Sequence, residues 1–398
     1  MMNIRWRIST FLADLQQTLF PALAAVVPAP VTSEHERLAS ILELVQVERD
    51  IPAPQTTARG GRPPHDRRKL ARAYVAKAAL GMSENEEIYY RLESDRTLRR
   101  LCGWEEGRGL PSLPTFSRAF AEFAMTQVLD RRHAELVITH LGDSITEHVG
   151  YDSTAIAVRE RVVKPASPAA TAPSSVDSPP VKKRGRRPKG SEPPPPPEPT
   201  RLQRQRTQTL GEMLAELPTA CAVGCKQDSH GNKDYWIGYK FHVAQTDDGI
   251  PVAAITTSAN LHDSQAAIPL LRRTHARVRC CYDLLDSAYD AQEIRAESRE
   301  LGHVPIIDAN ARRTETKAER DRLARLPRSR LTVDRALVEV DRRRRFGARS
   351  AVERFNSRLK DDGGARLIRV RGPAKVHAFL MCGLLVIFAE ALMALGGG

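Results

Sequence analysis

Three acidic residues, far apart along the chain, have side chains that could do chemistry together: Asp152, Asp286 and Glu353. Cleavage of a phosphodiester bond needs an activated water or hydroxyl and relief of charge on the leaving oxygen. Two Mg²⁺ ions about 3.5–4 Å apart supply both. Mg²⁺ prefers oxygen ligands and takes few of them from protein, because phosphate and water complete its shell. Three converging carboxylates would therefore be enough to hold such a centre.

Glu353 lies in the segment with the most specific spacing. Phe346, Arg349, Glu353 and Lys360 are separated by two, three and six residues. At about 100° per residue, their side chains fall within an arc of roughly 60° on one helix. That face would present a carboxylate flanked by two cations beneath an aromatic ring, which suits a divalent metal beside a nucleic-acid phosphate. An exposed basic helix with a chance glutamate is the alternative.

The two aspartates need strands to bring them together. Residues 148–158 predict a strand that contains Asp152, and residues 280–286 predict an apolar strand that ends at Asp286. Each aspartate alone could also be a plain turn or strand-end cap. Further alternation and helical periodicity predict a hairpin over 236–259, helices over 262–278 and 291–302, and a strand over 303–308. This order indicates a mixed sheet with helices on its faces, with Glu353 on a helix at the sheet edge.

The sequence before and inside this region has a different character. Residues 58–145 are helical in pattern, with Arg118 on a helix predicted to begin at Pro114. They fit either a helix-turn-helix DNA reader or a plain helical bundle. Residues 165–200 hold 12 of the 27 prolines, which predicts a disordered or polyproline insert, with order returning near Tyr235. The Arg184–Pro188 run inside it fits a minor-groove hook or a solvated basic linker.

Composition limits the partners. Net charge is +13 over 398 residues, which favours a polyanion, nucleic acid before an acidic membrane surface. Six cysteines form no disulfide framework and fit a reducing cytosol; Cys221 and Cys225 lack a second pair and predict no zinc site. No signal peptide is expected. The apolar stretch 376–395 has an uncharged core too short to span a membrane and predicts a buried helix.

Together these segments resemble a known family. Residues 147–395 are similar to the catalytic domain of bacterial insertion-sequence DDE transposases, which has an RNase H-like fold. One large group of these carries a Tyr-x2-Arg-x3-Glu-x6-Lys signature; here Phe346 replaces the tyrosine. The other matching segments are YDSTAIAVRE, LLDSAYDAQEI and the hairpin that ends in His262 and Asp263. Residues 60–125 resemble the family's N-terminal helical domain through GRPPHD, LRRLCGW and LPSLPTFSRAF.

The resemblance implies an α/β fold, an RNase H-like mixed sheet with flanking helices, preceded by an all-α N-terminal domain. Three parts are expected. Residues 1–57 would be an N-terminal helical segment, 58–145 a helical DNA-binding domain, and 146–398 the DDE catalytic domain. The insert would interrupt the last of these at about 163–205.

The resemblance also implies the reaction: metal-dependent strand cleavage at element ends and attack of the 3′-hydroxyl on target DNA. Asp152, Asp286 and Glu353 would be catalytic and would hold Mg²⁺ or Mn²⁺, as two ions. The residues expected to contact DNA are Arg349, Lys360, Arg354, Arg184, Arg186 and Arg118.

The expected partners are double-stranded DNA, both terminal inverted repeats and target, and a second copy of the chain in a homodimer on that DNA. No membrane is expected, and the protein would act in the bacterial cytoplasm, associated with the nucleoid. Two alternatives remain open: a catalytically decayed, transposase-derived DNA-binding protein, and a structure-specific nuclease of the same fold.

Overall fold

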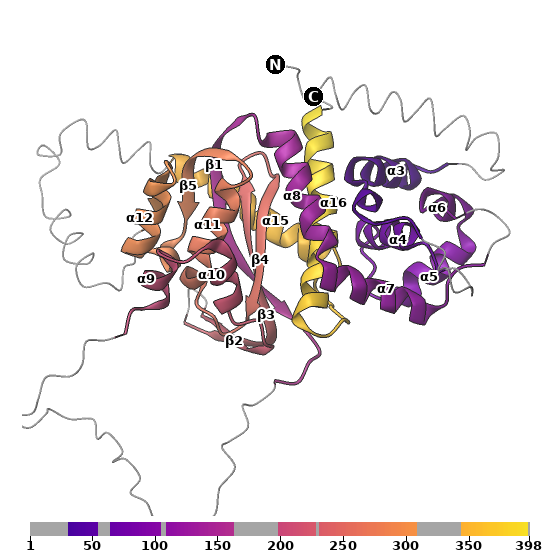
Figure 1. The fold of residues 1–398 in the computed structure, drawn as a ribbon, viewed down its shortest axis with the longest axis horizontal. Helices are drawn as coiled ribbons and strands as arrows, with labels where there is room; N and C mark the ends of the chain where they lie inside the picture. The colour runs from indigo at the N-terminus through magenta and orange to yellow at the C-terminus, as the bar shows by residue number, and fades with distance from the viewer. Residues whose placement is uncertain are drawn as a thin grey trace, which may run out of the picture.

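A mixed β-sheet forms the centre of the larger half of the molecule (Figure 1). The computed structural model describes residues 31–54, 64–104, 109–162, 198–227, 231–308 and 344–396. Within these residues the strands are β1 (Ile145–Ala157), β2 (Ala222–Gln227), β3 (Lys233–Thr246), β4 (Pro251–Ser258), β5 (Arg279–Leu285) and β6 (Val304–Ile307).

The strand order is β2-β3-β1-β5-β6, and β4 also pairs with β3. Strand β3 runs antiparallel to β1, β2 and β4, whereas β5 runs parallel to β1, and β6 parallel to β5. The β3–β4 hairpin turns at Gly249, whose φ of 86° favours glycine. This mixed sheet with flanking helices, preceded by a helical region, confirms the predicted fold class.

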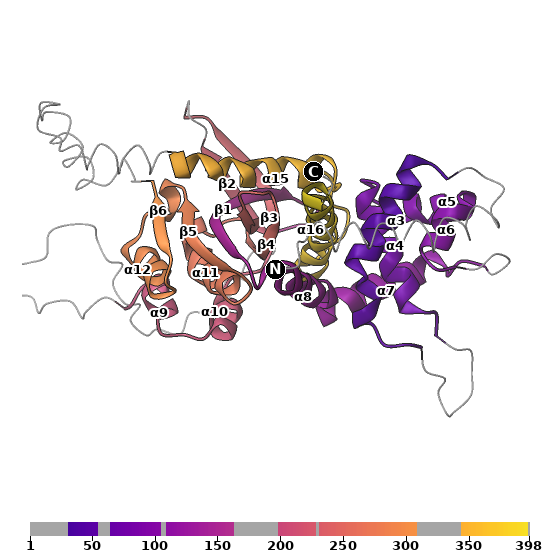
Figure 2. The same ribbon diagram turned by 90° about the horizontal axis from the view of Figure 1, so that it is seen from above.

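Helices cover both faces of the sheet. In Figure 2, α15 (Ser350–Asp361) lies on one side, and α9 (Arg201–Gln205), α10 (Leu210–Glu216), α11 (Ala267–His275) and α12 (Gln292–Glu300) lie on the other. Short 3-10 helices precede three of the longer elements: η2 (Asp263–Ala266), η3 (Ser287–Tyr289) and η5 (Gly347–Arg349).

Regular structure returns earlier than the sequence predicted. Helices α9 and α10 and strand β2 all precede Tyr235, and α9 falls inside the end of the insert predicted at about 163–205. Their start signals are capping boxes: Thr200 with Gln203, and Thr209 with Glu212. The short elements had been masked by the proline-rich composition before them. Residues 163–197, with Arg184 and Arg186, lie outside the described residues.

The N-terminal part is helical. It contains α3 (Ser33–Val45), η1 (Val47–Asp50), α4 (Arg67–Ala79), α5 (Asn85–Ser94), α6 (Arg96–Leu101), α7 (Leu113–Thr126) and α8 (Val128–Leu141). Pro114 lies in the first turn of α7, as predicted. Phe116, Phe120 and Phe123 of α7 surround the Tyr74 ring of α4, with centroid distances of 6.3, 4.7 and 6.3 Å.

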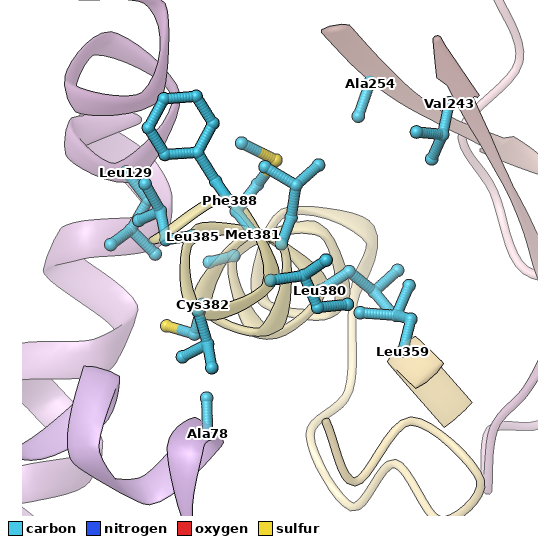
Figure 3. Packing of buried hydrophobic residues seen from close by; sticks show 14 of the residues in the cluster. Ala78, Leu129, Val243, Ala254, Leu359, Leu380, Met381, Cys382, Leu385 and Phe388 are labelled. Atoms are coloured by element: carbon cyan, nitrogen blue, oxygen red, sulfur yellow. The ribbon is translucent and has the colours of Figure 1, made fainter. Parts of the chain in front are cut away.

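Helix α16 (Pro373–Gly396) joins the two halves. It contacts α3, α4, α7 and α8 on one side and β4 and α15 on the other. Figure 3 shows Cys382 near Ala78 of α4, and Leu380 pointing toward Leu359 of α15. By length and composition alone α16 could cross a membrane, but 78% of its most apolar 18-residue window is buried inside the protein. The prediction of a buried helix is confirmed.

Candidate metal centre

Asp152 and Asp286 lie side by side on neighbouring strands. Gly150 of β1 pairs in parallel with Leu284 of β5, and each aspartate lies two residues further along its own strand path. The two are therefore level on strands about 4.8 Å apart. Asp286 follows the last residue of β5, where its carboxylate accepts a hydrogen bond from the Ala288 backbone N–H at 2.9 Å. The predicted strand positions of both residues are confirmed.

The two carboxyls are electrostatically unfavourable in the absence of a cation. Burial raises the pKa of Asp152 to about 6; Arg349 opposes this shift and the nearby Asp286 adds to it. Burial also raises the pKa of Asp286, with a further contribution from Asp263. Both effects disfavour the charged form. A bound divalent cation would offset the cost of two buried, neighbouring negative charges. The pair therefore has the electrostatics of a metal-binding site.

Helix α15 approaches β1 closely at Gly150. A Cβ atom there would lie 3.5 Å from Arg349 Cα and 3.8 Å from Val352 Cβ, which is ordinary contact distance. This packing places the Arg349 guanidinium over the site, with one nitrogen 3.8 Å from Asp152 Oδ1. Another nitrogen donates to Glu353 Oε1 at 2.7 Å. Arg349 thus links two of the three predicted metal ligands.

The signature residues do not all lie on one regular helix, as the sequence had predicted. Phe346 and Arg349 precede α15, in a helical turn and in the 3-10 segment η5. The i,i+4 pairing of Arg349 with Glu353 survives because the backbone stays in the right-handed helical region there. The Phe346 ring packs against Arg349, 5.6 Å from its Cζ, so the ring contact does not need a tyrosine hydroxyl.

Glu353 is the predicted ligand farthest from a binding arrangement. Its side chain is 58% exposed and paired with Arg349. Among the described residues, two groups of acidic, histidine or cysteine side chains have ligand atoms within 4.8 Å of one another, and neither includes the three predicted ligands. They are Cys280–Asp283–His303 and Glu147–His148–Asp247. In this structure Glu353 is paired with Arg349 and is not grouped with the two aspartates.

The buried Cys280–Asp283–His303 group is a satisfied hydrogen-bond network. Asp283 Oδ1 accepts from Tyr151 Oη at 2.9 Å. Asp283 Oδ2 accepts from Ser298 Oγ at 2.6 Å and also lies 3.0 Å from His303 Nδ1. These bonds use the lone pairs that a cation would need. The network ties β1 to β5 directly behind the two aspartates.

Sequence reasoning missed two side chains at the site, Asn356 and Lys226, whereas Tyr289 belongs to the LLDSAYDAQEI segment that carried the resemblance. Asn356 Nδ2 donates to Asp152 Oδ2 at 3.0 Å. Tyr289 is fully buried and lies near enough to Asp152, Asp286 and Asp263 for their charges to raise its pKa, although burial is the larger cause. Lys226 of β2 lowers the pKa of both Asp152 and Asp286. Asn356 lies three residues after Glu353, but helical spacing alone does not show which carboxylate its amide meets. Lys226 lies in a strand that was not predicted.

Two buried polar atoms at the site have no protein partner among the described residues: Asn356 Oδ1 and Tyr289 Oη. Buried polar atoms are nearly always hydrogen-bonded to protein or water. An amide oxygen and a hydroxyl beside two carboxylates form an all-oxygen environment, which suits Mg²⁺ or Mn²⁺ rather than a soft metal. The residues present therefore fit a hydrated divalent cation.

The predicted DNA-contacting residues lie in different places. Lys360 is half-buried, and burial together with Lys226 lowers its pKa. Arg354 is exposed on another side of α15 and lines a cavity of about 640 Å³ with Arg358 and Gln245. Arg118 is exposed on α7 in the helical part, and donates to Thr115 Oγ1 at 3.2 Å.

Comparison with known proteins gives two family matches. Residues 200–389 match the family "Transposase DDE domain", and residues 29–122 match "Transposase domain (DUF772)". Asp152 precedes the first of these ranges and follows the second, so its place beside Asp286 comes from the fold.

Two curated relatives, from two strains of Halobacterium salinarum, are named "Probable transposase for insertion sequence element ISH11". Each is 28% identical over 156 residues, which is 39% of this chain and 47% of the relative. The chain thus spans about half the length of these relatives. No solved structure matches. Two transposase domain families matched along one chain, together with these relatives, identify the chain as an insertion-sequence transposase with a DDE domain.

Proposed function

We propose that this protein cuts DNA at the ends of its insertion sequence and joins the freed 3′-hydroxyl to target DNA. The observation that supports this most is the level placement of Asp152 and Asp286 on two parallel strands. Helix α15, which contains Glu353, packs against the first of these strands. Family membership indicates the class of reaction, and Asp152 and Asp286 form the candidate site for that reaction.

A divalent cation, Mg²⁺ or Mn²⁺ and used in pairs, would activate the attacking hydroxyl and neutralise the leaving oxygen. Asp152 and Asp286 would hold it, and Glu353 would complete the set after leaving Arg349. Arg349 and Lys360 would then be available to phosphate. Arginine binds phosphate as a planar, bidentate donor and lysine as a point charge.

The substrate we propose is double-stranded DNA, both the terminal inverted repeats of the element and the target. Lys226 on β2 and Lys360 on α15 each interact electrostatically with Asp152, and they lie near enough to each other for Lys226 to lower the pKa of Lys360. DNA that presents a phosphate to the aspartates would meet both lysines. A homodimer on DNA, and residence with the nucleoid in the cytoplasm, belong to the same proposal.

The test uses Asp152→Asn, Asp286→Asn and Glu353→Gln in the full chain, with DNA carrying the repeats that flank the gene. Each change should abolish Mg²⁺-dependent nicking while binding to that DNA persists, because only the cation ligands are lost. Glu86→Gln, an exposed glutamate of α5, is the matched control and should nick normally. Substantial nicking by any of the three site variants would contradict the assignment.

Two further outcomes separate the alternatives. Nicking without joined products on a target plasmid would indicate a nuclease rather than a transposase. DNA binding without nicking by the unchanged protein, at any Mg²⁺ or Mn²⁺ concentration, would indicate a decayed enzyme.

A further inference from the structure

Asn356 connects helix α15 to the catalytic strand β1. Its amide Nδ2 donates to Asp152 Oδ2 at 3.0 Å, and the residue is only 8% exposed. The orientation of the amide follows from chemistry, because an ionised carboxylate can only accept and must therefore face the NH₂ group. The amide oxygen is consequently not bonded to Asp152 Oδ2. No protein group among the described residues bonds to it.

Asn356 is in contact with one of the predicted metal ligands, and the other groups of the site are acidic or polar. Asp152 and Asp286 lie on the neighbouring strands, and the Tyr289 hydroxyl, also buried and unpaired, is close enough to feel both charges. Arg349, a cation at the site, already donates to Glu353 at 2.7 Å. A cation or its bound water is the partner that would satisfy an amide oxygen among carboxylates, since hard cations accept carboxylate and amide oxygens together.

We propose that Asn356 is a further oxygen donor of the metal centre, holding Asp152 with its amide nitrogen and facing the divalent cation with its amide oxygen. The inference rests on the proposed function, because it concerns the same cation. It adds a neutral ligand from the helix that also contains Glu353. The three-residue separation puts Glu353 and Asn356 on adjacent positions of one helical face.

The experiment measures Mn²⁺ binding to the full-length protein without DNA, by electron paramagnetic resonance of free Mn²⁺. Asn356→Ala removes both the nitrogen and the oxygen and should weaken Mn²⁺ binding about 10- to 100-fold, the range for lost supporting interactions at metal sites. Asn356→Asp retains an oxygen donor and should recover most of the lost affinity. Ser357→Ala, an exposed neighbour on α15, is the matched control and should bind as the unchanged protein does.

Two results would overturn the inference: Mn²⁺ affinity of Asn356→Ala within about threefold of the unchanged protein, or no recovery in Asn356→Asp. The second would mean that only the amide nitrogen matters. Thermal melting without metal tests whether each variant is folded. If Asn356→Ala is unfolded, the Mn²⁺ affinity of Asn356→Asp, compared with that of the unchanged protein, decides whether the inference holds. Asp152→Asn separates a failure of this inference from a failure of the proposed metal centre. If it binds Mn²⁺ normally, the metal centre itself is wrong.

Discussion

At the scale of single residues, the acidic pair costs the protein stability when no cation is bound. Burial raises the pKa of Asp152 to about 6, from an ordinary value of 3.8. The folded state therefore binds a proton more tightly than the unfolded chain. The contribution of Asp152 to the free energy of unfolding therefore falls as pH rises from about 4 to about 6, and above that range it stays constant because the carboxylate is charged in both states.

Asp152→Asn removes this cost. Each pKa unit corresponds to about 1.4 kcal/mol, so the metal-free variant should be more stable than the unchanged protein by about 1–3 kcal/mol at pH 7. The difference should vanish at about pH 4. Urea denaturation at both pH values, with EDTA present, measures it. Asp143→Asn, at an exposed carboxylate, should change little; equal stability of Asp152→Asn and the unchanged protein at pH 7 would contradict the argument.

The sequence singled out the two aspartates but not Asn356, for a physical reason. Asp152 and Asp286 could be found because strand patterns and chemistry point to the same residues. Asn356 could not be singled out, because an amide on a helix has many uses and only the fold shows which carboxylate it meets. The i,i+4 spacing of Arg349 and Glu353 allows the two side chains to pair, but the sequence does not determine whether their rotamers do so.

At the scale of elements, the position of α15 depends on how closely it packs against α16. A side chain at Gly383 of α16 would force the Leu359 side chain to move, because a Cβ there would lie 2.8 Å from Leu359 Cδ1. Leu359 lies one turn from Asn356 on the same helix. Any displacement of α15 at Leu359 therefore reaches the bond between Asn356 and Asp152.

Gly383→Val should displace α15 and weaken Mn²⁺ binding several-fold, together with a loss of stability of about 1–3 kcal/mol from overpacking. Gly211→Val on α10 is the control, because nothing lies within 4 Å of its Cβ position. It should keep the Mn²⁺ affinity and change the stability by under about 1 kcal/mol, because valine is no worse a helix former than glycine. If Gly383→Val loses stability and binds Mn²⁺ normally, the α15–α16 packing does not set the site.

The elements that sequence patterns missed are short and adjoin the proline-rich run. Helix α9 has five residues and α10 has seven. Segments of this length carry too few apolar positions to show a helical period, and their stability comes from tertiary contacts. One such contact is Arg206 of the α9–α10 connection with Glu297 of α12, at 3.0 Å. The long strands and helices were predicted because their periodicity is complete within one segment.

At the scale of the whole molecule, the net charge of +13 favours DNA, but its effect depends on where the charges lie. Lys226 and Lys360 lie beside the acidic pair, whereas Arg299 is exposed on α12, on the other side of the sheet from α15 (Figure 2). Only cations that meet phosphate release counterions on binding. The salt dependence of binding thus reports which face the DNA uses.

Lys226→Ala and Lys360→Ala should each weaken binding to element ends and make the slope of log affinity against log salt shallower by about 0.9. Arg299→Ala should leave the slope unchanged. Fluorescence anisotropy in a salt series, performed on the Asp152→Asn background to prevent cleavage, measures all three. An unchanged slope for either lysine variant would show that this lysine does not contact DNA phosphate. A shallower slope for Arg299→Ala would show that DNA binds on the face of the sheet that α12 covers.

Helix α16 has a consequence for synthesis on the ribosome. It contacts the N-terminal helices and the sheet together, yet it follows every other described element in chain order. Domains that complete their own cores can fold as they emerge, but here both halves remain without their shared helix until translation has passed residue 396. The apolar surface of the N-terminal helices therefore stays exposed until α16 is made, and folding depends on contacts that are distant in sequence. We expect chaperones to bind the growing chain at this surface.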